Sequence, residues 1–328
     1  MLPFSYRKIL AIKDLKRAPI GPDGRFLAGG TTLVDLMRQQ VERPVQVIDI
    51  NALPLTEIAR TREGGLRIGA LVRMSQLAAD PAILADYPAV SQALLLSASP
   101  QLRNMATIGG NLMQRTRCSY FRDLEMPCNK RKPGSGCAAL EGENRRHALL
   151  GTSEHCIATH PSDLAVVFAA FAAKIEVLAA NGRRLVPIAD FHRLPGNTPH
   201  IETLLEAGDL ITAILLPSLP AARRSLYLKL RDRASYDFAL VSVAAGIERA
   251  TDGTVSEARL ALGGVGTKPW RATTAESLLR GEPLTPDRMK QAAEAALEGA
   301  KPQSGNGFKM ALARRAIMRV LGDLEQQA

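Results

Sequence analysis

The sequence predicts an α+β protein of two or three packed units, and three observations support this fold class. The chain has 328 residues, more than one compact core usually spans. Strand-like and helix-like patterns alternate through its first two thirds. The last third contains three strand patterns followed by two helix patterns, which indicates a separate α+β domain. Hydrophobic residues make up 46% of the chain, so it can bury a core.

A small β/α unit is expected over residues 1–57. Its first strand is a short apolar run that ends in two consecutive glycines, and its last strand is β-branched and alternating. A helical pattern lies between these strands, with a threonine in the N-cap position. The predicted elements are a strand at 25–28, a helix at 33–40 capped by Thr32, and a strand at 45–50.

A second α/β region is expected over residues 58–217. A hairpin turn is predicted at Asn181-Gly182, because this dipeptide favours tight turns between strands. The other predicted elements are a strand at 66–70, a helix at 89–98, a turn at 107–111, a helix at 163–173, and strands at 174–178 and 210–216.

Residues 113–160 interrupt this region. They are rich in Arg, Cys, Gly and Pro and have no clean hydrophobic period, so we expect a long irregular loop. Such a loop inside a compact domain is usually functional.

The C-terminal domain is expected over residues 218–328, with a three-stranded antiparallel sheet followed by helices. The dipeptide Asp252-Gly253 predicts the turn between the second and third strands. The predicted elements are strands at 227–230, 239–248 and 257–262, and helices at 286–300 and 307–323.

All the cysteines of the chain lie in the 113–160 loop: Cys118, Cys128, Cys137 and Cys156. Four thiolates are what an iron–sulfur cluster or a structural zinc site needs, but the wide, unequal spacing does not name the metal. Two disulfides in an oxidising compartment, or four free thiols, remain alternatives. Cationic neighbours would favour thiolates: Arg115, Arg117, Arg122, Lys130 and Arg131.

The charge balance argues against nucleic acid as a partner. Lys and Arg number 42 against 32 Asp and Glu, a net charge of +10, but the positive residues are scattered and aromatics make up only 4%. No stretch reaches the roughly 20 apolar residues that span a bilayer, so membrane insertion is not expected. The first 16 residues lack the apolar core of a signal peptide.

Two glycine-rich turns are candidate phosphate sites. Gly29 and Gly30 join a strand to a helix N-terminus, where backbone N–H groups and the helix dipole suit a pyrophosphate. A similar turn at 107–111 could contact the same dinucleotide from a second side. A plain tight turn is the alternative at each position.

Several motifs together resemble a known family. Residues 28–33, 107–111 and 160–163 are similar to the FAD-binding motifs of the xanthine dehydrogenase and carbon monoxide dehydrogenase flavoproteins, and residues 229–239 and 262–266 are similar to the second domain of that family. The resemblance covers essentially the whole chain. It implies a two-part FAD-binding domain of the PCMH type, like that of vanillyl-alcohol oxidase, followed by the C-terminal domain.

The cysteine loop resembles the [4Fe-4S] insertion in the flavin subunit of bacterial periplasmic aldehyde oxidases. This implies that all four cysteines ligate a [4Fe-4S] cluster. It also implies a three-subunit enzyme. A large molybdenum-cofactor subunit converts the aldehyde to a carboxylic acid, a small subunit holds two [2Fe-2S] clusters, and this chain passes electrons through FAD to an external acceptor. The chain would hold no catalytic residue and would reach the periplasm with a partner; the cytoplasm is the alternative.

The resemblance also implies FAD contacts. Asp163 would hydrogen-bond the cofactor and Lys229 would lie near the isoalloxazine, where a cation stabilises reduced flavin. Residues 236–238 would face the ring. Without the resemblance, Asp163 could simply cap a helix and Lys229 could be solvated. The implied contacts are Leu27, Ala28, Gly29, Gly30, Thr31, Thr32, Leu33, Thr107, Ile108, Gly109, Gly110, Asn111, Ser162, Asp163, Ile211 and Lys229.

Two other functions stay open. A self-sufficient flavin oxidoreductase on the same fold would turn over substrate as an isolated chain. A zinc- or thiol-based sensor would bind zinc and no flavin.

Overall fold

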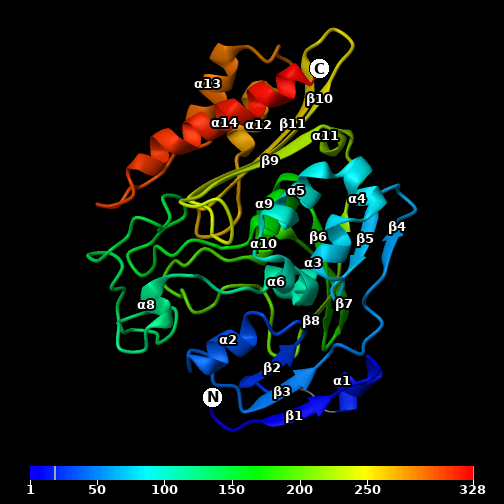
Figure 1. Ribbon diagram of the computed structural model, residues 1–328, viewed down its shortest axis with the longest axis vertical. Helices are drawn as coiled ribbons and strands as arrows, with labels where there is room; N and C mark the ends of the chain where they lie inside the picture. The colour runs from blue at the N-terminus through cyan, green and yellow to red at the C-terminus, as the bar shows by residue number, and fades with distance from the viewer. Residues whose placement is uncertain (18–19, 328) are drawn as a thin grey trace.

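The computed structural model describes residues 1–17 and 20–327, and the chain forms three β-sheets with helices packed against them. Figure 1 shows the N-terminal sheet at one end, the five-stranded sheet in the middle, and the C-terminal sheet with its helices at the other end. In the described part of the chain, no helix has both the length and the apolar composition needed to cross a membrane.

The N-terminal sheet is parallel, with strand order β1-β3-β2. Its predicted strands at 25–28 and 45–50 are confirmed as β2 and β3. The sequence pattern missed β1 because its side chains are polar and largely exposed. Thr32 does precede α2, but its side chain makes no capping hydrogen bond. The elements are β1 (Ser5–Lys8), α1 (Lys13–Arg17), β2 (Gly24–Leu27), α2 (Leu33–Arg38) and β3 (Gln46–Asp49).

The middle sheet is antiparallel, with strand order β4-β5-β8-β6-β7. The predicted hairpin at Asn181-Gly182 is confirmed, since it joins β6 to β7. The strands are β4 (Ile58–Arg60), β5 (Leu66–Gly69), β6 (Lys174–Ala179), β7 (Gly182–Pro187) and β8 (Leu210–Leu216).

Seven helices of the described chain accompany this sheet, and α9 is buried along its whole length. That helix shares one apolar core with strands of the middle sheet and contacts strands of the C-terminal sheet, so it lies between the two sheets. The helices are α3 (Met74–Ala78), α4 (Pro81–Asp86), α5 (Pro88–Leu96), α6 (Pro100–Met105), α7 (Ile108–Leu112), α9 (Asp163–Ala170) and α10 (Ile188–Phe191).

The prediction of a turn at 107–111 is wrong. Residues Ile108–Leu112 form α7, and Thr107 is its N-cap, whose hydroxyl accepts a hydrogen bond from the Gly110 N–H. This cap offsets the low helix propensity of the two glycines, because it satisfies one of the N–H groups that a helix start leaves unpaired.

The C-terminal sheet is antiparallel and has four strands, not the predicted three, in the order β12-β11-β10-β9. The additional strand has only two residues and pairs with Ala261 and Leu262, so it is too short to produce a sequence pattern. The strands are β9 (Ser225–Leu230), β10 (Val241–Arg249), β11 (Val255–Gly263) and β12 (Trp270–Arg271).

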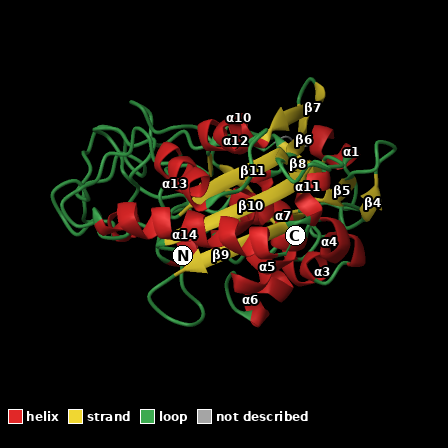
Figure 2. Cartoon of the chain, turned by 90° about the horizontal axis from the view of Figure 1, so that it is seen from above, coloured by secondary structure: helices red, strands yellow, loops and turns green. Residues whose placement is uncertain are grey.

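Helices pack against the C-terminal sheet, and three of them, α12, α13 and α14, share its apolar core, whereas α11 belongs to the core of the middle sheet. Figure 2 shows β9, β10 and β11 side by side, with the loops gathered at one end of the molecule. The predicted helix at 286–300 ends earlier, at Ala295. The helices are α11 (Pro220–Arg223), α12 (Thr273–Leu279), α13 (Pro286–Ala295) and α14 (Phe308–Gln326).

The cysteine loop, residues 113–160, is largely irregular, as the sequence predicts. It contains one short helix, α8 (Ser119–Arg122), and an isolated β-bridge between Cys128 and Cys137. The loop projects to one side of the middle sheet in Figure 1.

Candidate cofactor site

A cavity of about 570 Å³ opens between the N-terminal sheet, α7 and the segment 192–211. Ten of the predicted FAD contacts line it: Ala28, Gly29, Gly30, Thr31, Thr32, Leu33, Thr107, Gly109, Gly110 and Ile211. Six others lie outside its lining: Leu27, Ile108, Asn111, Ser162, Asp163 and Lys229.

The first glycine turn lines this cavity with residues 29–33. In the described part of the chain, no hydrogen bond uses the N–H groups of residues 29–33. Gly30 has a φ of +72°, a conformation that favours glycine. A Cβ on Gly29 would lie 2.1 Å from the Met105 carbonyl oxygen, so close packing requires glycine there too. These unpaired donors at a helix start fit a phosphate group.

The second glycine-rich segment, residues 107–111 at the start of α7, has a different role. Its N–H groups donate to protein acceptors: Ile108 to the Val72 carbonyl at 3.0 Å and Gly109 to the Ala70 carbonyl at 2.8 Å. This segment therefore lines the cavity, and few of its donors remain for a ligand.

A chain of five charged side chains runs along the cavity wall: Arg25, Glu42, Arg115, Glu202 and Lys130. Glu202 accepts from Arg115 Nε at 2.9 Å and lies 2.7 Å from Lys130 Nζ. Burial alone would raise the pKa of Glu202, but the charges of Lys130 and Arg115 lower it. The pairs connect segments far apart in sequence, so no sequence pattern predicts them.

Two histidines form part of the same wall. The rings of His160 and His192 meet edge to face at 4.2 Å between centroids. Burial lowers the pKa of His192 to about 4 and that of His160 well below its usual value. His192 Nε2 lies 3.0 Å from the Leu112 carbonyl oxygen. The cavity is therefore lined here by neutral imidazoles at pH 7.

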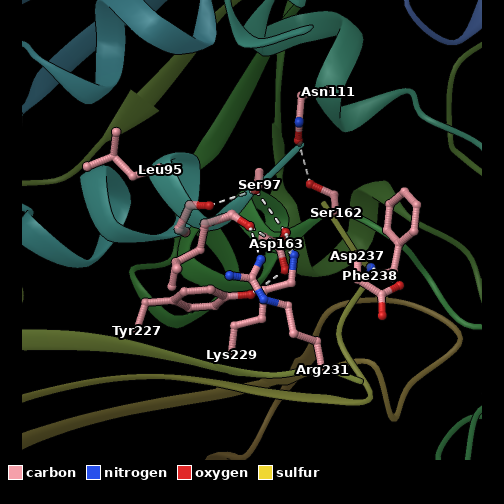
Figure 3. A network of polar contacts seen from close by, with 12 residues as sticks. Leu95, Ser97, Asn111, Ser162, Asp163, Tyr227, Lys229, Arg231, Asp237 and Phe238 are labelled. Atoms are coloured by element: carbon pink, nitrogen blue, oxygen red, sulfur yellow. Dashed lines mark hydrogen bonds and ion pairs between the residues drawn. The ribbon is translucent and has the colours of Figure 1, made fainter. Parts of the chain in front are cut away.

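Asp163 and Lys229 lie together in a buried network rather than on the cavity wall (Figure 3). Lys229 Nζ is 2.8 Å from Asp163 Oδ2, and the two side chains are 1% and 6% exposed. The Asp163 carboxylate also accepts from Tyr227 Oη at 2.6 Å and Ser97 Oγ at 2.8 Å. The protein thus gives both charges partners of their own, and their contact with FAD stays a prediction.

Asn111 and Ser162 also bond to each other (Figure 3). Ser162 Oγ donates to Asn111 Oδ1 at 2.6 Å, and it accepts from the Ala165 N–H as the N-cap of α9. This hydrogen bond joins α7 to α9, so it fixes the second glycine-rich segment relative to the buried helix. Ser162, not Asp163, is the capping residue.

The four cysteines line one small cavity, and all four are free. No disulfide joins them. Burial raises the pKa of Cys118 to about 12 and also raises the pKa of Cys156. Buried thiols of this kind lose their protons when a metal ion binds them, so the donor set fits a thiolate-ligated metal group. Among the residues the structure describes, no three His, Cys, Asp or Glu side chains form a preformed site for a single metal ion.

The two cavities share a wall. Thr116, Lys130 and Ala158 line both of them. Lys130 follows Cys128 by two residues, and its charge lowers the pKa of Cys156, although burial has the larger effect. The cysteine loop therefore contributes directly to the larger cavity, which the motif positions alone did not reveal.

Comparisons with known proteins agree with this architecture. Residues 3–219 match the model described as the FAD binding domain in molybdopterin dehydrogenase, and residues 226–324 match the CO dehydrogenase flavoprotein C-terminal domain. The chain is 50% identical to the aldehyde oxidoreductase FAD-binding subunit PaoB of Escherichia coli K12, over 94% of this chain and 93% of that protein. It is 28% identical to the carbon monoxide dehydrogenase medium chain of Hydrogenophaga pseudoflava, over 92% of this chain and 89% of that protein.

Solved structures show the same fold. Quinoline 2-oxidoreductase from Pseudomonas putida 86 aligns with a TM-score of 0.75 and 25% identity, over 100% of this chain and 98% of that one. Carbon monoxide dehydrogenase from Hydrogenophaga pseudoflava aligns with a TM-score of 0.74 and 27% identity, over 98% of each chain.

The fold is that of the medium chain of a multi-subunit molybdenum hydroxylase. The chain belongs to the FAD-binding subunits of the molybdopterin dehydrogenase family, and it is a subunit of an oxidoreductase related to xanthine dehydrogenase.

Proposed function

We propose that the chain is the FAD- and [4Fe-4S]-carrying electron-transfer subunit of a heterotrimeric, molybdenum-dependent aldehyde oxidoreductase. One observation carries the proposal: five consecutive residues, whose N–H groups have no partner in the described chain, line a cavity whose wall is shared with a four-cysteine cavity. The 50% identity to an aldehyde oxidoreductase subunit supports the substrate class.

The N–H groups of residues 29–33 would hold the FAD pyrophosphate, with the hydroxyls of Thr31 and Thr32 beside it. Ile211 and the neutral rings of His160 and His192 would line the remainder of the cavity. Bound there, FAD accepts electrons and passes them on. The residues of this chain bind and orient it, and they exclude water from part of its surface.

The four cysteines would ligate the cluster as thiolates, and nearby Lys130 offsets part of the added negative charge. Replacing Cys128 by Ser is expected to lower the iron content and to destabilise the loop. Leu124→Ala is the control, because that side chain is exposed in the same loop and lies outside the lining of the cysteine cavity. If Cys128→Ser keeps its iron and its stability, the ligand assignment is wrong.

In this proposal the substrate chemistry belongs to a large molybdenum-cofactor subunit, and a small subunit with two [2Fe-2S] clusters delivers electrons to this chain. The resemblance to medium chains of multi-subunit enzymes supports these partners. An external acceptor takes the electrons from the flavin. The periplasm, reached by export with a partner, is part of the same proposal.

Anaerobic addition of an aldehyde tests the function. The flavin absorption should bleach in the complex purified through a tag on this chain, and it should stay unchanged in the chain alone. Bleaching of the isolated chain would instead identify a self-sufficient flavoenzyme. A colourless, zinc-loaded chain would identify a metal or thiol sensor.

A further inference from the structure

One buried histidine of the cysteine loop contacts a cysteine sulfur. His147 Nε2 lies 3.2 Å from Cys118 Sγ, and His147 is only 6% exposed. Its other ring nitrogen, Nδ1, is buried and has no hydrogen-bond partner among the described residues. The sulfur is therefore the single polar contact of this imidazole in the described chain.

The C-terminal domain fixes the backbone of this histidine. The His147 carbonyl oxygen accepts from Lys309 Nζ at 3.0 Å and from Asn306 Nδ2 at 3.2 Å. Both residues are fully buried, and Lys309 Nζ also donates to the Gly264 carbonyl at 2.8 Å. The ring packs against Tyr120 at 6.3 Å between centroids. Because the backbone and the ring are both held, the Nε2–Sγ contact is built into the fold.

A thiolate that ligates iron has no proton to donate, so a nitrogen in contact with it must be the donor. A neutral imidazole carries one N–H, and the hydrogen bond at one nitrogen determines the tautomer. The Nε2 atom would therefore carry the proton and Nδ1 would not. Hydrogen bonds to cluster sulfurs stabilise the more negative, reduced state and raise the reduction potential.

We infer that His147 is a positioning and tuning residue of the proposed [4Fe-4S] cluster, which donates an Nε2–H hydrogen bond to the Cys118 sulfur. The inference rests on the proposed function, because it requires a cluster on the four cysteines. It adds a fixed donor from outside the ligand set, held in place by α14 and the segment before it. The cluster's potential is thus coupled to the packing of the C-terminal domain.

The test is an EPR-monitored redox titration of the complex purified anaerobically, comparing the natural chain with three variants. His147→Phe removes the donor and keeps a ring of similar size, so the cluster should remain and its potential should fall. His147→Gln keeps an N–H donor and should recover part of that shift. Leu124→Phe is the control, since it places a ring on an exposed side chain of the same loop, outside the lining of the cysteine cavity.

Each outcome has a separate meaning. An unchanged potential in His147→Phe with full iron content would overturn the inference while leaving the proposed cluster intact. Loss of iron in His147→Phe but not in Leu124→Phe would make His147 a ligand or an essential support instead of a tuning donor. If the natural complex shows only the iron–sulfur signals of its partner subunits, the proposed cluster fails, and the inference fails with it.

Discussion

Lys130 Nζ lies 2.7 Å from Glu202 Oε1, so a residue of the cysteine loop holds the segment that borders the larger cavity. Arg115, also from the cysteine loop, binds the other oxygen of the same carboxylate at 2.9 Å. Two residues of the cysteine loop therefore bind the same glutamate in the cavity wall. Order in the loop and retention of the flavin should depend on each other.

Replacing Glu202 by Gln should weaken FAD binding. The change leaves Lys130 and Arg115 partly buried without their shared anion, at a cost on the order of 2 kcal/mol. The measurement is FAD content per chain together with the rate of FAD loss on dilution. Glu63→Gln, on an exposed side chain, is the control. Equal FAD loss from both variants would contradict the role of the ion pairs.

The ion pairs of Glu202 with Lys130 and Arg115 also predict that FAD binding is sensitive to acid. The folded pKa of Glu202 is lowered, so its contribution to stability is present above the ordinary pKa of a glutamate and is lost as the pH falls through the lowered value. FAD should therefore be released more readily in acid from the natural chain than at neutral pH. In Glu202→Gln this part of the pH dependence should be absent.

Replacing Gly30 by Val should lower FAD affinity by about tenfold or more, equivalent to at least about 1.4 kcal/mol. The residue has a φ of +72°, which a β-branched side chain does not adopt readily, and a Cβ would lie 3.2 Å from Val34 Cγ2. The turn would distort and its N–H groups would move. Titration of FAD into apoprotein measures the effect. Gly322→Ala, in α14 with open space around it, should bind FAD normally.

Replacing Asp163 by Asn should destabilise the fold by on the order of 3–5 kcal/mol, because it leaves the buried charge of Lys229 unpaired. Removing both charges, with Lys229→Met added, should restore much of the loss. Chemical denaturation of the single and double variants checks this. The exposed Asp287→Asn should change stability by less than about 0.5 kcal/mol. A double variant no more stable than Asp163→Asn would argue against a simple ion pair.

The lowered pKa of Lys309 leads us to expect that the stability of the fold depends on pH. Burial lowers its pKa to about 7, with smaller effects from Arg145 and Arg146. The unfolded chain therefore binds a proton that the folded chain lacks between about pH 7 and the ordinary lysine pKa, so stability should rise with pH in that window. The rise should approach about 1.4 kcal/mol per pH unit at most. Lys309→Met should show a flatter curve, and parallel curves would contradict the shifted pKa.

The elements with strong hydrophobic patterns could be predicted from the sequence. The hydrophobic patterns of Leu210–Leu216 and Phe308–Gln326 extend over enough residues to indicate a strand and a helix, respectively. The strand Ser5–Lys8 could not, because its polar side chains are mostly exposed, and Trp270–Arg271 is too short. These two strands form because their backbones pair with other strands of the chain.

The candidate site was predictable where backbone chemistry defines it. Adjacent glycines before a helix indicate an anion site, and four cysteines in one loop indicate a shared centre. The partners of Glu202 and the contact between His147 and Cys118 were not predictable. These contacts join residues that are distant in the sequence. No sequence motif indicates which charged or imidazole side chains will meet in the fold.

The most direct test of the central claim is the flavin, iron and zinc content of the natural chain after anaerobic purification. The account predicts one FAD and four irons per chain, with matching sulfide and little zinc. A chain that contains neither flavin nor iron, or one that binds zinc on its cysteines, would contradict it.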